Sequence, residues 1–327
     1  MHVAVLVNDP EALVATQTTA MLIHKAADRG YVVDVVGVDG LTSTAEGRVH
    51  GRGKRVPAPS REALVEALRT ADAHAVDLSE VDVLLMRTNP ARDARRWAHE
   101  AALSFAGLLE AQGVLVLNRP EGLLRARDKL YLQRLPASVY PATLVSRDAD
   151  AIRAFIRDLD GPAVLKPLQG TRGTDVFFAD APDAPNLRPI IDVLTRQGFA
   201  VVQEYLPEAA EGDTRVVVMD GEVLEIAERA AAIRRVPAGD DFRSNLHAGG
   251  TAQPASVTSA MRAAVEEIGP MLRADGLFLV GLDFIGGRII EVNAFSTGGL
   301  HHAERFEEVD FCAAVFDAIE LRLERMT

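Results

Sequence analysis

The chain has 327 residues, 48% of them hydrophobic, and a mean hydropathy of +0.07, which predicts a globular protein of two or three domains. Its formal charge of −12, from 47 acidic and 35 basic residues, opposes nucleic-acid binding. A single cysteine, Cys312, excludes a disulfide framework, and we expect its thiol to be buried. The first residues lack a basic segment and no apolar run approaches the ~18 residues that span a bilayer, so we expect a cytoplasmic protein without membrane contact.

The first 120 residues alternate short apolar runs with helical patterns. Gly30 and Gly113 follow two of these patterns and are expected to end helices. Strands are predicted at residues 2–7, 31–38, 81–86 and 114–117, and helices at 16–29 and 94–112. Unbroken valine- and leucine-rich strands between helices are typical of a parallel sheet covered on both faces. We therefore predict an open α/β domain over residues 1–120.

The pattern changes after residue 120. A small α+β module is predicted at residues 121–204, where a glycine-rich turn and one long helix separate strands at 163–167, 176–179 and 201–205. The remainder, 205–327, forms a third unit with two hairpins. Asp220-Gly221 would join the first, because both positions tolerate a positive φ. Its strands are expected at 215–219 and 222–226, those of the second at 277–285 and 289–293, helices at 256–274 and 310–326, and loops near residues 182–185 and 237–250.

The second hairpin, GLDFIGGRIIEVN, places Asp283, Glu291 and Asn293 around a glycine turn. Oxygen ligands of this kind suit magnesium. A two-residue loop would point Asp283 away from Glu291, whereas a three-residue loop over residues 286–288 with a bulge would set them face to face. We predict the three-residue loop. The alternative is a solvated hairpin with two polar strand positions.

Two lysines offer charge for phosphate. Lys166 ends an apolar strand, and Gly170 and Gly173 after it let backbone N–H groups approach an anion. Lys129 lies in RARDKLYL. The spacing is not a Walker motif, and a solvated lysine beside an ordinary turn is an equally good interpretation of each.

Residues 201–221, VVQEYLPEAAEGDTRVVVMDG, form a third candidate segment. Residues 203–206 could meet an adenine edge, Asp213 a ribose and Arg215 a phosphate. In an acidic chain, the arginines that follow predict a local anion site, because paired N–H bonds hold carboxylate or phosphate. A surface loop with ion pairs to Asp240 and Asp241 is the alternative. The arginines are Arg229, Arg234, Arg235 and Arg243.

Taken in order, these segments resemble the ATP-grasp superfamily and, within it, the bacterial glutathione synthetase family. Eight segments carry the match along nearly the whole chain: LVNDP, LLMRTNPARD, VLNRPEGLLRARDKL, VLKPLQGTRG, QEYLP, EGDTRVVVMDGE, FRSNLHAGG and VGLDFIGGRIIEVNAFS. The resemblance implies an α/β, three-domain ATP-grasp fold. It would have an N-terminal open parallel sheet, a central lid and a C-terminal mixed sheet, with ATP between the last two.

The resemblance also implies roles for individual residues. Lys129, Lys166 and the loop residues Gly170, Thr171 and Gly173 would bind the ATP phosphates. Gln203, Glu204, Tyr205 and Leu206 would line the adenine, Asp213 would contact the ribose, and Arg215 would face phosphate. Arg215, Arg235 and Asn245 would act on the transferred group, while Arg87, Arg243, Asn245, Ser296, Gly298 and Gly299 would bind substrate. Asp283, Glu291 and Asn293 would hold two Mg²⁺ ions, for which Mn²⁺ would substitute.

The implied reaction is the joining of a carboxylate to an amine. Transfer of the γ-phosphoryl group would make an acyl-phosphate, and amine attack would release phosphate and leave an amide and ADP. Amino acids or short peptides would be the substrates, with γ-glutamylcysteine and glycine the leading pair, and the family implies a homo-oligomer. Two alternatives stay open: a related ligase of specialised metabolism and a non-catalytic nucleotide-binding protein. A nicotinamide dehydrogenase is disfavoured, because no glycine follows the first strand in LVNDPEALVATQ.

The sequence departs from the family pattern at three places. Thr88 and Asn89 in MRTNPA stand where the family has a cation and an acid in MRKDPP. Arg172 replaces a familiar glycine of the phosphate loop. The tail FSTGGLHH, residues 295–302, differs near the acceptor amine; its adjacent His301 and His302 are expected to be solvated in a loop rather than to bind metal.

Overall fold

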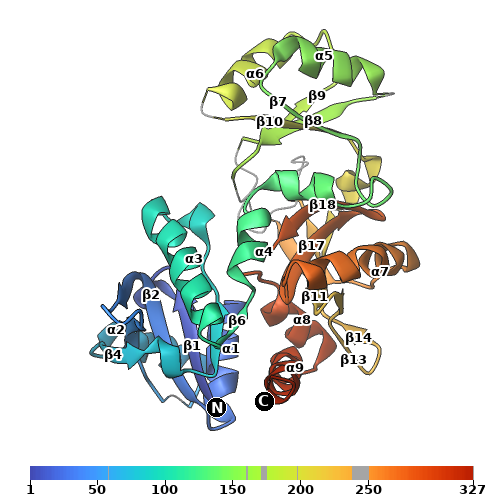
Figure 1. Cartoon of the computed structure of the whole chain (residues 1–327). Helices are drawn as coiled ribbons and strands as arrows, with labels where there is room; N and C mark the ends of the chain where they lie inside the picture. Colours follow the sequence, from blue (N-terminus) through green and yellow to red (C-terminus); the bar gives the residue numbers. More distant parts are fainter. Residues whose placement is uncertain (58, 160, 171–174, 197, 238–249, 327) are drawn as a thin grey trace.

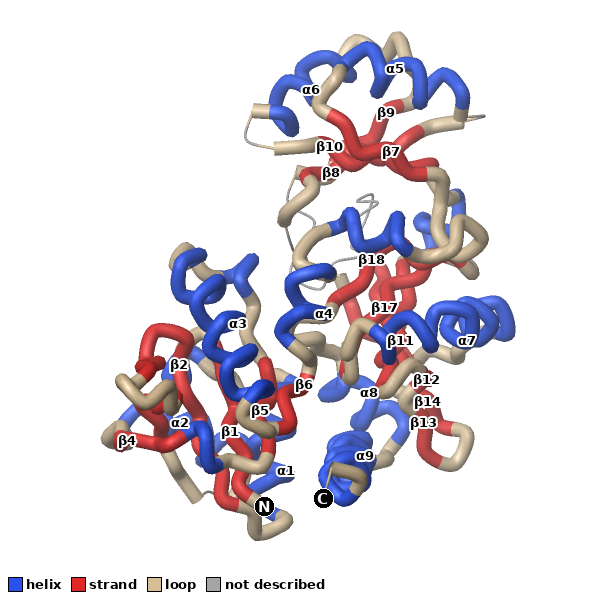
Figure 2. The backbone as a smooth tube through the Cα atoms, viewed as in Figure 1, coloured by secondary structure: helices blue, strands red, loops and turns tan. Residues whose placement is uncertain are grey.

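A computed structural model gives the structure, which describes residues 1–57, 59–159, 161–170, 175–196, 198–237 and 250–326. Three larger β-sheets follow one another along the chain, and Figures 1 and 2 show the second of them as a lid above the other two. None of the described helices combines the length and the apolar run needed to cross a membrane.

The N-terminal sheet has the strand order β4-β3-β2-β1-β5-β6. The predicted parallel strands are confirmed, and Gly30 (φ 78°) and Gly113 (φ 95°) follow the helices they were expected to end. An antiparallel edge, β3 and β4, was missed because VHGRGK lacks an apolar run. The elements are β1 (His2–Val7), α1 (Thr18–Asp28), β2 (Val32–Ser43), β3 (Val49–Lys54), α2 (Arg61–Thr70), β4 (His74–Asp77), β5 (Val83–Met86), α3 (Arg96–Ala111), β6 (Leu115–Leu117) and α4 (Pro120–Arg125).

Alternation along β1 explains why both faces of this sheet are covered. Ala4 and Leu6 pack in the cluster that contains the apolar side of α3, whereas Val3 and Val5 pack with α1. Successive side chains on a strand point to opposite faces, so a continuous apolar strand needs a helix on each side. The expected two-sided α/β sheet is therefore present.

The lid sheet has the order β7-β10-β8-β9, and its helices α5 and α6 lie on the outer face in Figure 1. The structure has two helices here where one was predicted, and β7 was missed. The other face of the sheet turns toward the rest of the molecule. The elements are β7 (Thr143–Ser146), α5 (Ala149–Asp158), β8 (Ala163–Pro167), β9 (Phe177–Ala179), α6 (Leu187–Thr195) and β10 (Ala200–Glu204).

The C-terminal sheet has the order β16-β15-β11-β17-β18, with α7 on one face and α8 and α9 on the other. Asp220 (φ 52°) and Gly221 (φ 76°) form the predicted two-residue turn. Cys312 is buried in α9, as expected. The elements are β11 (Asp213–Met219), β12 (Glu222–Val223), β13 (Glu225–Ile226), β14 (Arg229–Ala230), β15 (Ala232–Val236), β16 (Thr251–Pro254), α7 (Ser259–Ala274), β17 (Leu279–Ile285), β18 (Arg288–Asn293), α8 (Leu300–Glu307) and α9 (Phe311–Glu324).

The second hairpin differs from its prediction in one respect. Ile285 pairs with Arg288, so the loop is the two glycines alone, and the predicted three-residue loop is wrong. The extra residue lies inside β18, where Ile290 is passed over between two pairs. This bulge still sets Asp283 opposite Glu291, so the predicted facing of the two acids is confirmed.

Candidate functional site

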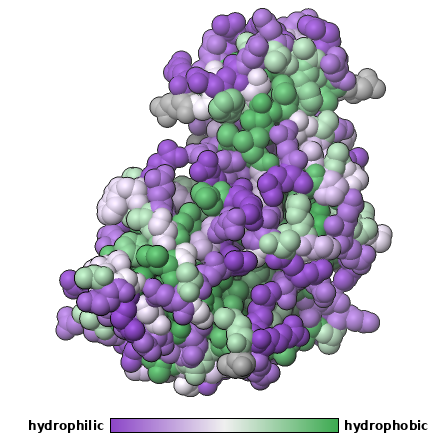
Figure 3. All heavy atoms as spheres, viewed as in Figure 1, coloured by the Kyte–Doolittle hydropathy of each residue, from purple (hydrophilic) through white to green (hydrophobic). Residues whose placement is uncertain are grey.

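A cavity of about 900 Å³ opens where the three sheets approach one another. Figure 3 shows apolar side chains gathered on the underside of the lid, above a body whose visible surface mixes hydrophilic and apolar side chains. Loops of the N-terminal sheet, strands β8 and β10 of the lid, and one face of the C-terminal sheet all contribute to the wall. The cavity can therefore hold a ligand the size of a nucleotide with room for a second molecule.

Cross-strand register brings the charged residues of the C-terminal sheet together. Asp213 pairs with Arg235, and Arg215 pairs with Asp283, which pairs in turn with Glu291. Directly opposite residues share a face, and so do alternate residues on one strand. All five side chains consequently line the cavity, together with Asn293 two positions beyond Glu291.

Asp283 is held by two guanidinium groups. Arg215 donates from Nε and Nη2 to the two carboxylate oxygens at 2.7 Å each, and Arg235 Nη2 lies 2.8 Å from Oδ2. Asn293 Nδ2 donates to the same oxygen at 3.1 Å. Burial would raise the pKa of this 1% exposed carboxyl, but the two cations outweigh burial and hold the pKa well below its usual range.

Asp213, the predicted ribose contact, is engaged by Arg235. The guanidinium donates to both Asp213 oxygens at 2.6 and 2.7 Å, and both residues are buried. The ribose contact stays a prediction. Of the described arginines predicted to form an anion cluster, only Arg235 lines the cavity: Arg234 pairs with Glu211, and Arg229 donates to the backbone of Glu307.

The oxygen donors of the C-terminal sheet fit a magnesium site. Glu291 is the most available of them, since 33% of its side chain is exposed and the nearest ammonium, on Lys129, is 4.0 Å away. Among the described residues no group of three or more His, Cys, Asp or Glu side chains has metal-binding geometry. A cation would therefore rest on two carboxylates and the Asn293 amide, with phosphate oxygens completing its shell, as hard cations prefer.

Both predicted phosphate lysines reach this end of the cavity. Lys166, in β8, donates to the carbonyl of Ile290 at 3.3 Å, and Lys129 donates to the carbonyl of Gly170 at 3.2 Å. Burial lowers the pKa of Lys166 to about 8, and the Lys129 ammonium acts in the same direction. Neither is a solvated surface lysine. Thr171, Arg172 and Gly173 lie outside the described residues.

The segment predicted to meet adenine, residues 203–206, spans the end of β10. Gln203, Glu204, Tyr205 and Leu206 line the cavity beside apolar wall residues such as Val164 and Ile290. The Tyr205 ring stands edge-on to Phe178, with ring centroids 5.1 Å apart. The lid and the bulged hairpin thus form a partly apolar wall, which suits a flat heterocycle.

Arg87, just beyond β5, is a buried cation at the N-terminal end of the cavity. It is 6% exposed and donates to Thr19 Oγ1 at 3.2 Å and to the carbonyl of Thr297 at 2.7 Å. Burial lowers its pKa to about 10, and the described part of the chain gives it no acidic partner. A buried guanidinium of this kind is stabilised when an anion approaches it.

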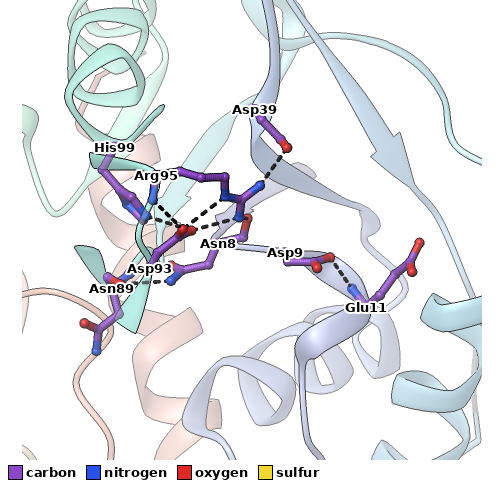
Figure 4. Close-up of polar contacts among 8 residues, drawn as sticks. All are labelled: Asn8, Asp9, Glu11, Asp39, Asn89, Asp93, Arg95 and His99. Carbon is purple, nitrogen blue, oxygen red and sulfur yellow. Dashed lines mark hydrogen bonds and ion pairs between the residues drawn. The ribbon is translucent and has the colours of Figure 1, made fainter. Parts of the chain in front are cut away.

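The unusual MRTNPA segment is held rigidly. The Asn8 side-chain amide accepts from the backbone N–H of Asn89 at 2.6 Å and donates to its carbonyl at 2.8 Å, and Figure 4 shows the Asn89 side chain pointing away from this clamp. Arg95 Nη2 donates to the backbone carbonyl of Asn8 at 2.9 Å and also to the carboxylate of Asp93. Thr88 is buried and is not among the residues that line the cavity. The role of Asn8 was missed; only the LVNDP match hinted at it.

The remaining substrate-side predictions divide in two. Ser296, Gly298 and Gly299 line the cavity, whereas Arg243 and Asn245 lie outside the described residues. His301 and His302 were predicted to lie in a solvated loop, and this prediction is wrong. Both lie in the first turn of α8 and are partly buried, because LHHAERFE forms an amphipathic helix.

Comparison with known proteins agrees with this geometry. Residues 1–124 match the family model "Prokaryotic glutathione synthetase, N-terminal domain" and residues 128–308 match "Prokaryotic glutathione synthetase, ATP-grasp domain". The glutathione synthetase of Shewanella oneidensis is 37% identical over 254 residues, 77% of each chain. That of Synechococcus elongatus is 38% identical over 225 residues, 68% of this chain and 67% of the relative.

A solved structure of the ATP-grasp ligase PsnB with a minimal precursor shares the fold, with a TM-score of 0.65, 19% identity and 99% coverage of both chains. Together the two family models match nearly all of residues 1–308. The chain therefore belongs to the prokaryotic glutathione synthetase family of C–N ligases and has the ATP-grasp fold.

Proposed function

We propose that this protein uses ATP to join γ-glutamylcysteine to glycine through an acyl-phosphate. The observation that carries the proposal is the charged face of the C-terminal sheet. Three carboxylates and an amide there face the same cavity as two arginines of the sheet and two lysines. That arrangement suits a nucleotide triphosphate with its metal ions.

ATP would lie between the lid and the C-terminal sheet, with adenine against residues 203–206. Lys129 and Lys166 would meet the phosphates, with the loop residues Gly170, Thr171 and Gly173 beside them. Asp283, Glu291 and Asn293 would hold two Mg²⁺ ions, replaceable by Mn²⁺, which would offset phosphate charge. Because magnesium prefers oxygen ligands, Asp283 would exchange guanidinium contacts for the cation.

Arg215 and Arg235, released from Asp283, would then face the transferred phosphoryl group, with Asn245 nearby. Cationic side chains stabilise the charge that spreads over its oxygens during in-line transfer. The amine would attack the acyl carbon, phosphate would leave, and the lid would exclude water that otherwise hydrolyses the intermediate.

Substrates would occupy the N-terminal end of the cavity. Arg87 would pair with a carboxylate, with Arg243, Asn245 and residues 296–299 completing the wall. The rigid, uncharged Asn89 favours a second candidate, a ligase of the same mechanism that joins other amino acids or peptides. A non-catalytic protein is less well supported, since Asp283, Glu291 and Asn293 are all retained.

A product screen tests the proposal. The protein is incubated with Mg–ATP and pairs of carboxylates and amines, with phosphate release and product mass as readouts. Glutathione from γ-glutamylcysteine and glycine is the expected product. Another amide in its place would select the second candidate, and ATP binding without any amide from any pair would contradict ligation.

The assembly and the compartment complete the proposal. We expect a homo-oligomer, which analytical ultracentrifugation would test. The reducing cytoplasm is the expected location, because it would keep the thiol of the proposed donor reduced.

A further inference from the structure

His302 lies on the cavity wall, at the end where the proposed substrates would lie. It is the one histidine among the described residues that line the cavity, and it stands in the first turn of α8. Neither ring nitrogen makes a hydrogen bond to another described residue; Nδ1 is buried, whereas Nε2 keeps accessible surface. The ring stacks on Phe306 of the same helix, with ring centroids 6.2 Å apart. The imidazole is therefore packed in place with one nitrogen open to a ligand.

A short series of contacts joins His302 to the proposed phosphoryl site. A Cβ atom on Gly299 would lie 3.6 Å from Cδ of Arg215, so Gly299 adjoins the arginine proposed to meet the transferred group. The backbone N–H of His302 donates to the carbonyl of Gly299 at 3.2 Å. Three residues of helix rise about 5 Å, and side chains on a helix lean toward its N-terminus. The imidazole therefore leans back toward Gly299 and the phosphoryl site.

The proposed reaction needs a group that accepts a proton at this place. The amine of an amino acid is protonated at neutral pH, and an ammonium has no lone pair with which to attack an acyl carbon. A carboxylate is a weak base, since the pKa of its acid is about 4, whereas that of a histidine is about 6.5. Burial and the Arg305 guanidinium lower the pKa of His302, so its imidazole is neutral at pH 7 and able to accept a proton.

The carboxylates of the described cavity wall are already engaged. Each accepts a hydrogen bond or an ion pair from another described residue, and two of them are also proposed to hold magnesium. They are Asp9, Asp93, Glu204, Asp213, Asp283 and Glu291. Both lysines of the wall donate to backbone carbonyls. Among the described wall residues, His302 alone combines basicity near neutral pH with the lack of a hydrogen-bond partner.

We propose that Nε2 of His302 is the general base that takes a proton from the ammonium of the acceptor. The inference rests on the proposed ligation. Loss of that proton leaves nitrogen with a lone pair, the C–N bond forms, and the acyl C–O bond breaks as phosphate leaves with the electron pair. Nitrogen passes a second proton to the departing phosphate, so the products are the amide, hydrogen phosphate and an imidazolium. The imidazolium returns its proton to water before the next turnover.

Two acceptors of different basicity test this role. The full-length protein receives Mg–ATP and γ-glutamylcysteine, with saturating glycine or hydroxylamine; where the product screen selects another donor and amine, these replace γ-glutamylcysteine and glycine. Glycine arrives as an ammonium, whereas hydroxylamine is mostly unprotonated at pH 7 and converts an acyl-phosphate to a hydroxamate without a base. The rates of amide and hydroxamate formation are measured separately.

His302→Gln keeps a polar side chain that cannot accept a proton at neutral pH. We expect it to lower kcat for the amide by about 100-fold or more, the size of general-base catalysis, and to leave the rate of hydroxamate formation close to that of the wild type. His301→Gln is the matched control, because that ring is next in the same helix but is not among the described residues that line the cavity. It should form both products at wild-type rates.

The outcomes separate the base from the ligation. Equal loss of amide and hydroxamate in the folded variant, or amide formation at the wild-type rate, overturns the base, while amide from the wild type still upholds the ligation. Loss of the amide alone supports the base. A wild type that makes neither product with any donor overturns the ligation and the base with it. Thermal unfolding checks each fold, and His302→Asn takes the place of His302→Gln should the latter fail to fold.

Discussion

At the scale of the residue, the acids of the second hairpin have different surroundings. Asp283 is buried between two guanidiniums, while Glu291 is partly exposed with a lysine at 4.0 Å. Removing one partner of a buried ion pair leaves charge unpaired, whereas an exposed pair contributes little. Both residues are therefore proposed to bind metal, but only Asp283 is expected to contribute substantially to the stability of the fold.

Glu291→Gln and Asp283→Asn should both abolish amide formation, because each weakens the hold on magnesium. Only Asp283→Asn should also lower the free energy of unfolding, by about 3–5 kcal/mol, since Arg215 and Arg235 lose a charged partner. Phosphate release and urea unfolding measure the two effects. Normal turnover in Glu291→Gln, or an equal loss of stability in both variants, would contradict this assignment.

Lys166 makes nucleotide binding depend on pH. Its pKa of about 8 in the folded protein means that the ammonium which phosphate requires is lost above that pH. The affinity for the ATP analogue should fall as pH rises through about 8, by up to about tenfold per unit. Calorimetry between pH 7 and 9 measures it. Lys166→Arg, which stays charged, should show a flatter profile; the same slope in both would refute the role of Lys166.

The stability contribution of Lys166 has the opposite dependence. Its folded pKa lies below the ordinary 10.5, so between about pH 8 and 10.5 the unfolded chain binds more protons than the folded one. Stability from this residue therefore rises with pH across that window while nucleotide affinity falls. The charged form of Lys166 favours nucleotide binding, whereas its neutral form favours the folded state.

At the scale of the element, a close backbone approach fixes α7 on the C-terminal sheet. A Cβ atom on Gly269, inside this helix, would stand 2.2 Å from the carbonyl oxygen of Gly221 in the first hairpin turn. Glycine at both positions lets helix and turn touch through backbone alone. The helix in turn covers the sheet face opposite the cavity.

Gly269→Ala should therefore destabilise the protein by about 2–3 kcal/mol, despite alanine's higher helix propensity, because helix and turn must separate. Gly107→Ala in α3 is the control: its Cβ would meet nothing within 4 Å, so it should gain about 0.5–1 kcal/mol. Thermal unfolding of both variants checks the pair. A gain in Gly269→Ala would show that this contact does not constrain the helix.

At the scale of the whole molecule, the cavity wall comes from all three sheets, and the lid has a hydrophobic core of its own. A ligand that touches the lid and the C-terminal sheet at once binds the folded state and not the unfolded chain. Such binding raises the free energy of unfolding in proportion to the logarithm of the ratio of free ligand to Kd.

A non-hydrolysable ATP analogue with Mg²⁺ should raise the unfolding temperature, by an amount equivalent to about 2.7 kcal/mol at a hundredfold excess over Kd. Removing the metal with EDTA should cancel most of the shift, because the phosphates then meet Asp283 and Glu291 without a cation between them. Differential scanning fluorimetry measures this. A shift unaffected by EDTA would place the nucleotide away from these carboxylates.

The local sequence pattern was enough to predict many of the helices and strands of this protein. Apolar runs and glycines predicted β1, α1, α3 and both hairpins within a few residues, since strand period and helix endings are properties of short segments. The order of the eight matching segments was enough to identify the family. Strands β3 and β4 escaped prediction, because their residues carry no apolar alternation; β3 forms by pairing with β2, and β4 by pairing with β3.

The tertiary structure decided how the site residues are engaged. The ion pair of Asp283 with Arg215 joins residues 68 positions apart, and the clamp of Asn8 on Asn89 joins residues 81 positions apart. The bulge at Ile290 is local in sequence, but the pairing of β18 with β17 sets its position. The sequence by itself determined which residue types lie on each strand. Cross-strand register and burial, which depend on the whole sheet, determined which charges meet and which, like Arg87, have no acidic partner among the described residues.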